Sequence, residues 1–181
     1  MRHNHAPGFT LLELLVAIAI ISLMVGIVLP ALASARNTAR SAICLSNARQ
    51  LAEGLHMLAD ANGGRLPGVK DEEAWDVRVQ EHLGSNEDVF VCPSDEDALE
   101  ATAAGFPGLS YGWREWFEVD EETSSLSGRL LSSVTRPDLI LVFEDLSGRH
   151  DRDRINAATV DSSARSYLID EYLANLSLPI H

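Results

Sequence analysis

The sequence predicts an α+β protein in which a long N-terminal helix packs its second half against a small antiparallel sheet. Three observations lead to this prediction. An apolar run over residues 8–29 is long enough to span a bilayer. An amphipathic pattern with helical spacing follows it, and short β-rich segments between turn residues occupy much of the remaining chain.

The apolar run carries one charged residue, Glu13, just inside its start. A carboxylate buried in a bilayer costs roughly 2.5–3.5 kcal/mol, so such a group needs a partner. If the chain is cut between Gly8 and Phe9, the new amine of Phe9 lies one helical turn before Glu13, on the same face. The amine adds positive charge to a helix end that is already positive. We expect Glu13 to offset it, within one subunit or in a neighbouring one.

The helix is predicted to continue beyond the membrane segment. Small and apolar residues over 35–59 recur mostly at i, i+3 and i+4, and polar residues fill much of the other face. Asn62, Gly63 and Gly64 then read as a C-terminal stop. Gly26 and Pro30 are the weak points, because proline removes one helix bond, so we expect a bend or local melting there.

The start of the chain resembles the cleavage and methylation segment of type IV pilins and type II secretion pseudopilins. The residues that carry this resemblance are Gly8, Phe9, Thr10, Leu11, Leu12, Glu13, Leu14 and Leu15. The resemblance implies that a prepilin peptidase removes residues 1–8 and methylates the amine of Phe9. It also implies that Glu13 guides assembly into a filament, and Pro30 matches a proline found in many members.

The implied organisation has four parts: a leader (1–8), a membrane-spanning or filament-core half-helix (9–33), an amphipathic half-helix (34–63) and a periplasmic α+β head (64–181). The subunit would sit in the inner membrane with its head in the periplasm before entering a periplasmic or surface filament. The implied partners are homologous pilin or pseudopilin subunits, the prepilin peptidase and an inner-membrane assembly platform.

A second resemblance, to a large bacterial group of pilin-like proteins, covers the C-x-S-N-x-R-Q-L stretch at residues 44–51 and the exit at 64–67. Later landmarks agree, namely residues 91–95, residues 110–112 and the segment that ends near Glu144. Members often end in a His-x9-Asp-Gly pattern. Here ten residues separate His150 from Asp161, and Ser162 replaces the glycine.

Two other interpretations of the N-terminus remain open. Residues 33–35, Ala-Ser-Ala, supply a cleavage site for an ordinary secretory signal, although the apolar core of about 16 residues is slightly long for one. A plain membrane anchor is the other alternative, and it leaves Glu13 unexplained. Arginines on both sides of the run nearly balance, so the orientation rests on the resemblance.

Several short elements are predicted in the head. These are helices over 74–83 and 170–176, strands over 88–91 and 138–145, and a hairpin of 155–160 with 164–169 across residues 161–163. Cys44 and Cys92 are the two cysteines, and in an exported domain they favour one disulfide, with two buried thiols as the alternative. No metal site is expected at these cysteines, because neither a Cys-x-x-Cys motif nor a nearby histidine cluster exists.

No catalytic residues are predicted. His56, His82 and His150 follow no ligand spacing, and no glycine-framed serine appears. Calcium is a candidate cofactor because five acids lie close together in the sequence: Glu144, Asp145, Asp151, Asp153 and Asp161. A solvated acidic face is favoured over a calcium site at these residues. The aromatic residues Trp75, Tyr111, Trp113 and Trp116 are expected in the head core or in subunit contacts.

A formal net charge of −13 disfavours nucleic-acid binding, which needs basic patches. Together with this charge, the resemblance to pilins implies a non-catalytic filament subunit, preferably a type II secretion pseudopilin rather than a type IV pilin or a DNA-uptake minor pilin. A membrane-tethered binding module that does not polymerise is the alternative from another class.

Overall fold

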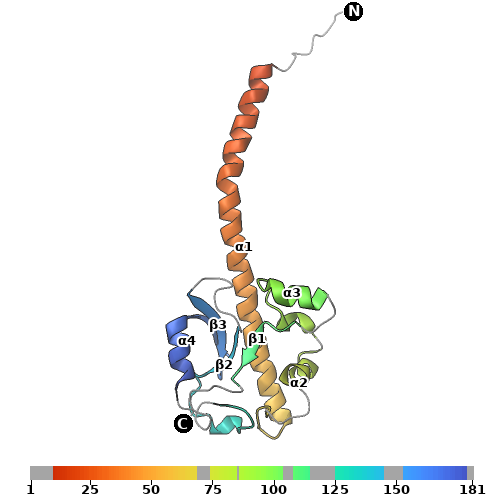
Figure 1. Cartoon of the computed structure of the whole chain (residues 1–181), viewed down its shortest axis with the longest axis vertical. Coiled ribbons are helices and arrows are strands. Elements are labelled where there is room, and N and C mark those ends of the chain that lie inside the picture. The colour runs from red at the N-terminus through yellow and green to blue at the C-terminus, as the bar shows by residue number, and fades with distance from the viewer. Residues whose placement is uncertain are drawn as a thin grey trace, which may run out of the picture. The chain divides into compact units, whose positions relative to one another are not determined.

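One long helix, α1, runs from Leu11 to Ala61 (Figure 1). The structure, a computed structural model, describes residues 10–68, 74–84, 86–103, 108–114, 125–144 and 153–178. The remaining elements in chain order are α2 (Trp75–His82), η1 (Glu87–Phe90), α3 (Glu96–Ala103), β1 (Tyr111–Trp113), η2 (Leu131–Ser133), β2 (Ile140–Glu144), β3 (Arg154–Thr159), β4 (Ala164–Leu168) and α4 (Ile169–Leu176). The chain divides into two compact units, Met1–Thr38 and Ala39–His181.

In the first unit, the large apolar side chains of α1 are exposed on every side of the helix. Exposure of these side chains to water is unfavourable, and a helix of this length and composition meets the requirements for crossing a membrane. The helix continues through Gly26 and Pro30 without interruption. The local melting expected at these residues is therefore absent from this structure, and the bend remains a prediction.

The end of α1 agrees with the predicted stop signal. Gly63 and Gly64 adopt positive φ angles of 65° and 83°, which glycine reaches without a steric penalty. The Gly64 amide donates to the carbonyl of Ala59 at 2.7 Å, so a carbonyl left without a helical partner is satisfied. The chain is thereby turned toward the head.

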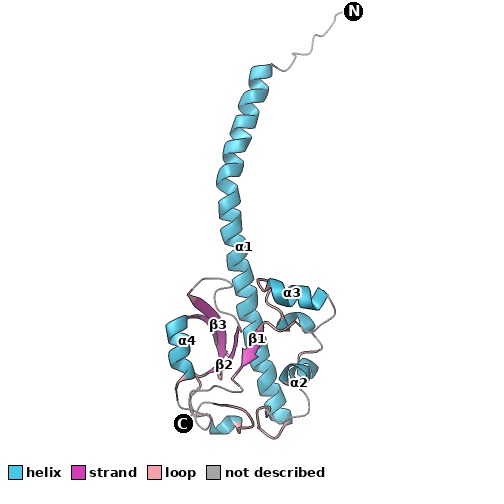
Figure 2. Ribbon diagram, in the orientation of Figure 1, coloured by secondary structure: helices cyan, strands magenta, loops and turns pink. Residues whose placement is uncertain are grey.

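The second unit is built on a four-stranded antiparallel sheet in the order β1-β2-β3-β4 (Figure 2). The predicted hairpin is confirmed as β3 and β4, with Arg154 opposite Leu168 and Ala158 opposite Ala164. The predicted strand over 138–145 is confirmed as β2, and every residue of β2 is buried. Burial on both faces explains why its sequence is almost continuously apolar rather than alternating.

Two apolar clusters lie on the two faces of this sheet. The larger one joins the buried stripe of α1, which includes Ala48, Leu51 and Leu55, to Leu141 of β2 and Ala158 of β3. The smaller one joins Ile140, Phe143, Ile155, Ala157 and Tyr167 of the sheet to Tyr172 and Leu176 of α4. The sheet is therefore covered by the C-terminal half of α1 on one face and by α4 on the other, as the predicted α+β fold requires.

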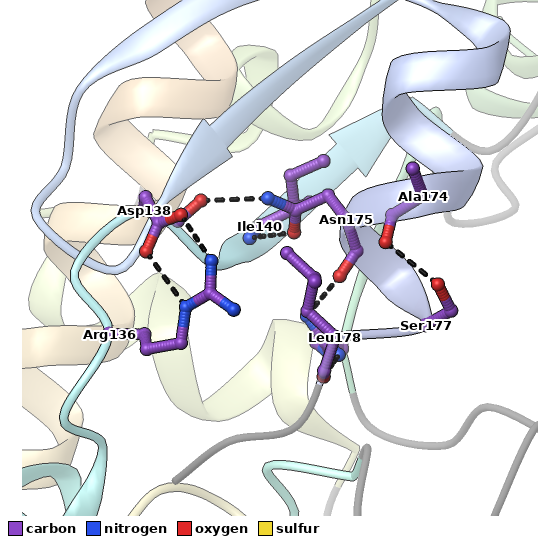
Figure 3. A network of polar contacts seen from close by, with 8 residues as sticks. Arg136, Asp138, Ile140, Ala174, Asn175, Ser177 and Leu178 are labelled. Carbon is purple, nitrogen blue, oxygen red and sulfur yellow. Dashed lines mark hydrogen bonds and ion pairs between the residues drawn. The ribbon is translucent and has the colours of Figure 1, made fainter.

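Asn175 fastens α4 to the start of β2 (Figure 3). Its side-chain oxygen accepts from the Ile140 amide at 2.8 Å, and its side-chain nitrogen donates to the Asp138 carbonyl at 2.9 Å. Beside this contact, Arg136 and Asp138 form a surface ion pair at 2.8 Å. Arg136 lowers the pKa of the Asp138 carboxyl, chiefly through their hydrogen bond, while Asp138 raises the pKa of Arg136 in the same way.

One predicted element is wrong. Residues 88–91 do not form a strand, because Glu87–Phe90 is the 3-10 helix η1. The side chain of Asn47 donates to the carbonyls of Asp88 and Val91, and the Phe90 carbonyl accepts from the Ser110 amide. Backbone groups that a neighbouring strand would have paired are thus occupied by other partners.

Three further elements were not anticipated: α3, β1 and the short 3-10 helix η2. An aspartate just before α3 is a sequence signal for the start of a helix. The Asp95 side chain accepts from the Ala98 amide at 3.1 Å, as an N-terminal cap does. The strand β1 is three residues long and contains Gly112. A Cβ at Gly112 would lie 3.0 Å from the ring of Phe143, so a glycine allows the close approach of β1 to β2.

Candidate functional site

Thr10 and Glu13 form a capping box at the first turn of α1. The Thr10 amide and hydroxyl both donate to Oε2 of Glu13, at 2.9 and 2.8 Å. In return, the Glu13 amide donates to the hydroxyl of Thr10 at 3.2 Å. These reciprocal bonds satisfy backbone donors that the helix itself cannot pair. The carboxylate of Glu13 therefore has a local role before any cleavage occurs.

This local role was missed in the sequence, although Thr-x-x-Glu before an apolar run is a signature of the capping box. Gly8 and Phe9, the expected cleavage and methylation residues, lie outside the described residues. The pairing of Glu13 with a new amine on Phe9 thus stays a prediction.

The disulfide between Cys44 and Cys92 is present in the structure. It joins α1 to the segment that follows η1, with the two Cα atoms 5.2 Å apart and both side chains fully buried. The bond closes a loop of 47 intervening residues. The chain-entropy model assigns a loop of this size about 4 kcal/mol of stabilisation, although that mechanism is debated.

Landmark residues from the stretches 44–51, 91–95 and 110–112 lie around this disulfide. Asn47, one turn after Cys44, donates to the carbonyl of Asp88 within η1 and to that of Val91 just after it. The Tyr111 hydroxyl donates to the Cys44 carbonyl at 3.0 Å. Ser110 accepts from the Cys92 amide at 2.9 Å and donates to the buried carboxylate of Asp95 at 2.7 Å. Residues that are far apart in the sequence thus form one buried polar cluster.

Glu144, at the end of β2, completes this cluster. Its carboxylate and the two sulfur atoms all lie within 4.8 Å of one another, and the side chain is buried. Asn156 of β3 donates to it twice, from the backbone amide to Oε2 and from the side chain to Oε1. The same side chain of Asn156 also donates to the hydroxyl of Ser41 on α1 at 3.3 Å.

Arg114 is a further buried charged group, and no sequence pattern indicated its position. Its guanidinium donates to the carbonyls of Asn175, Leu176 and Leu178, at 3.4, 2.8 and 3.1 Å. Cations are favourable at the C-terminal end of a helix, where carbonyls lack helical partners. Desolvation by burial lowers the pKa of Arg114 to about 10, so the side chain remains charged at neutral pH.

Within the described part of the chain, the remaining predicted candidates are not gathered into one site. His56 contacts the Val160 carbonyl at 2.5 Å, and His82 lies in the last turn of α2. Among the acids considered for calcium, Glu144 is bound by Asn156, whereas Asp161 accepts from Thr159 and Ser163 in the β3–β4 turn. Three further candidates, Asp145, His150 and Asp151, lie outside the described residues. Trp116 also lies outside them.

The aromatic residues that the structure describes have core positions. Tyr111 and Trp113 are buried in the larger apolar cluster, and Trp75 packs against it. The rings of Trp75 and Phe90 meet edge to face, with centroids 6.0 Å apart. These positions agree with the expectation of a head core.

The comparison with family models found one match. Residues 4–29 match the prokaryotic N-terminal methylation motif, which covers the expected cleavage junction and Glu13. The searches of curated proteins and of solved structures found no match. The motif thus coincides with the capping box and with the exposed apolar part of α1.

Proposed function

We propose that this chain, a type IV pilin-like protein, is a non-catalytic structural subunit of a filament and is processed by a prepilin peptidase after Gly8. The observation that carries the proposal is the methylation motif at the start of a membrane-length helix. The same helix continues into a head whose core is built on its C-terminal half. A subunit of this design is anchored by the apolar segment before assembly.

The exposed apolar side chains of α1 support assembly through this helix. In the first unit nothing in the described chain covers them, so lipid or the helices of other subunits must. Cleavage would give Phe9 a charged amine next to the turn that holds Glu13. The carboxylate could then exchange its bonds to Thr10 for the amine of its own or a neighbouring subunit.

Within the pilin-like class, we propose a type II secretion pseudopilin with its head in the periplasm. The support is the acidic composition, which disfavours the DNA contact expected of a DNA-uptake minor pilin. Deletion of the gene should make secreted enzymes accumulate in the periplasm. Loss of twitching or of DNA uptake with normal secretion would instead assign the chain to a type IV pilus.

Processing is tested on the natural product by intact mass and N-terminal sequencing. A chain that begins with methylated Phe9 supports the proposal. A chain that begins at Arg36 would identify an ordinary secretory signal, and a chain that retains residues 1–8 would identify a plain anchor.

Assembly is tested by the variant Glu13→Ala, with Glu53→Ala as the matched control. Glu53 is a carboxylate on the same helix, and it makes a surface ion pair with Arg49 at 3.0 Å. Glu13→Ala should insert normally but disappear from the sheared or sedimented filament fraction, whereas Glu53→Ala should remain in it. Normal function of Glu13→Ala without any filament would favour the membrane-tethered binding module.

A further inference from the structure

The carboxylate of Glu144 lies where it faces the sulfur atoms of Cys44 and Cys92. Its exposed fraction is 2%, and both cysteines are fully buried. All three ligand-type atoms lie within 4.8 Å of one another. Among the described histidines, cysteines and carboxylates, this is the group in which an acid approaches both sulfurs.

Burial of a carboxylate is costly unless hydrogen bonds compensate it. Asn156 supplies two such bonds, at 3.2 and 3.3 Å, one to each oxygen. The closed disulfide offers no hydrogen to the carboxylate, because neither sulfur carries a proton. The dithiol form that precedes it carries two S–H groups, which are donors. In the dithiol form, Glu144 is therefore placed to accept a hydrogen bond, and then a proton, from a cysteine thiol.

We propose that Glu144 is the proton acceptor that speeds closure of the Cys44–Cys92 disulfide. The step begins with one cysteine joined to a small-molecule thiol in a mixed disulfide, formed by reaction with a disulfide such as oxidised glutathione. The carboxylate takes the proton of the second cysteine, and the resulting thiolate attacks the protein sulfur of the mixed disulfide. The protein S–S bond forms, the mixed S–S bond breaks, and the departing thiolate recovers the proton from Glu144.

Thiolate is the reacting species in this exchange, so a nearby base raises its rate wherever the thiol is mostly protonated. The other titratable groups of the cluster are held by different partners. Tyr111, opposite Glu144 across β1 and β2, donates its hydroxyl to the Cys44 carbonyl. Asp95 accepts from Ser110 and from the Ala98 amide. Glu144 is the carboxylate that lies within 4.8 Å of both sulfurs, and it is the group placed to exchange a proton with them.

The test follows the closure reaction in the full-length chain in detergent. The protein is reduced, desalted and mixed with oxidised glutathione, then quenched with acid and alkylated, so that intact mass separates dithiol, mixed disulfide and closed forms. Glu144→Gln keeps the shape and removes the base. At pH 7 it should close the mixed disulfide about 10-fold more slowly or worse. The difference should shrink toward pH 9, where thiols ionise unaided.

Two controls separate this role from a merely structural one. Tyr111→Phe removes the other titratable side chain beside Cys44 and should close at the native rate. In 8 M urea, where Glu144 no longer faces the sulfurs, native protein and Glu144→Gln should close equally slowly. Equal rates for these two proteins in the folded state at pH 7 would overturn the proposal.

A third variant covers a failure of Glu144→Gln to fold, judged by near-UV circular dichroism. Glu144→Asp keeps a carboxylate but withdraws it by one methylene, so it should fold and close more slowly than the native chain. Closure of a folded Glu144→Asp at the native rate would count against proton transfer at this position. Neither result depends on whether the chain enters a filament.

Discussion

Nη2 of Arg114 lies 2.8 Å from the carbonyl oxygen of Leu176, at the end of α4. The residue that follows β1 is thereby bound to the last turn of the C-terminal helix, across 62 positions of sequence. Two more carbonyls of the same chain end accept from this guanidinium. Attachment of α4 to the sheet therefore depends on one buried cation as well as on the smaller apolar cluster.

Replacement of Arg114 should detach this end of the chain. Arg114→Met fills much of the same volume but leaves three carbonyls without their donor, so we expect a loss of about 2–4 kcal/mol in the free energy of unfolding. Arg136→Met is the matched control, because it removes a surface ion pair worth at most about 1 kcal/mol. Urea denaturation of both variants checks the prediction, and equal losses would contradict it.

The turn between β3 and β4 contains a non-glycine residue in a left-handed conformation. Ser162 has a φ angle of 60°. Ser162→Gly should therefore stabilise the protein by about 0.5–1 kcal/mol, since it relieves the strain of the left-handed region. Ser163→Gly, in the same turn but without a positive φ, should destabilise it. Thermal unfolding that shows the reverse order would refute this interpretation of the turn.

Acid should weaken the same turn through Asp161. Hydrogen bonds from Thr159 and Ser163 lower the pKa of its carboxyl. A lowered folded pKa means that stabilisation is present above the unfolded value of about 3.8 and is lost as the pH falls through the folded value. The urea midpoint of the native chain should exceed that of Asp161→Asn at pH 6, and the two should converge near pH 2. A constant difference across this range would contradict the assignment.

The two roles of Glu13 are separable by changing its capping partner. Thr10→Ala removes the hydroxyl of the box but keeps the carboxylate of Glu13 free to meet an amine. If the amine is the essential partner, Thr10→Ala should assemble while Glu13→Ala does not. Filament yield after shearing provides the measurement. Equal loss of filaments in both variants would show that the cap itself is what assembly needs.

Removal of the disulfide should cost more than any of these surface changes. The double variant Cys44→Ala, Cys92→Ala should lose about 4 kcal/mol of unfolding free energy from loop closure, with a further loss from the emptied core. A reducing agent should have no effect on the stability of this variant. Urea midpoints with and without dithiothreitol test both statements, and a reductant-sensitive double variant would refute them.

The sequence predicted the elements whose signals are local and repeated. The period of the apolar residues and the Asn62-Gly63-Gly64 stop placed the long helix, whose observed bounds are Leu11–Ala61. The apolar run of β2 and the hairpin were likewise readable. By contrast, η1 resembled a strand because Val89 and Phe90 are apolar and buried, and the carbonyls held by Asn47 are a tertiary feature.

The polar cluster at the disulfide shows why the site itself was only partly predictable. Each landmark was visible by itself, and the pairing of Cys44 with Cys92 was expected. The position of Glu144 beside the sulfurs depends on the register of β2 against β1 and β3, which no local pattern encodes. Arg114 is a similar case, because its acceptors belong to the distant chain end.

The disulfide also determines which parts of the chain bear mechanical load. A pull on the N-terminal end of α1, resisted by the sheet, passes from Cys44 to Cys92 through the sulfur atoms. Residues 45–91, including the final turns of α1 and the whole of α2, then lie off the line of tension. They can remain folded under a force that would otherwise unwind them first, and only a break in the covalent cross-link would expose them to it.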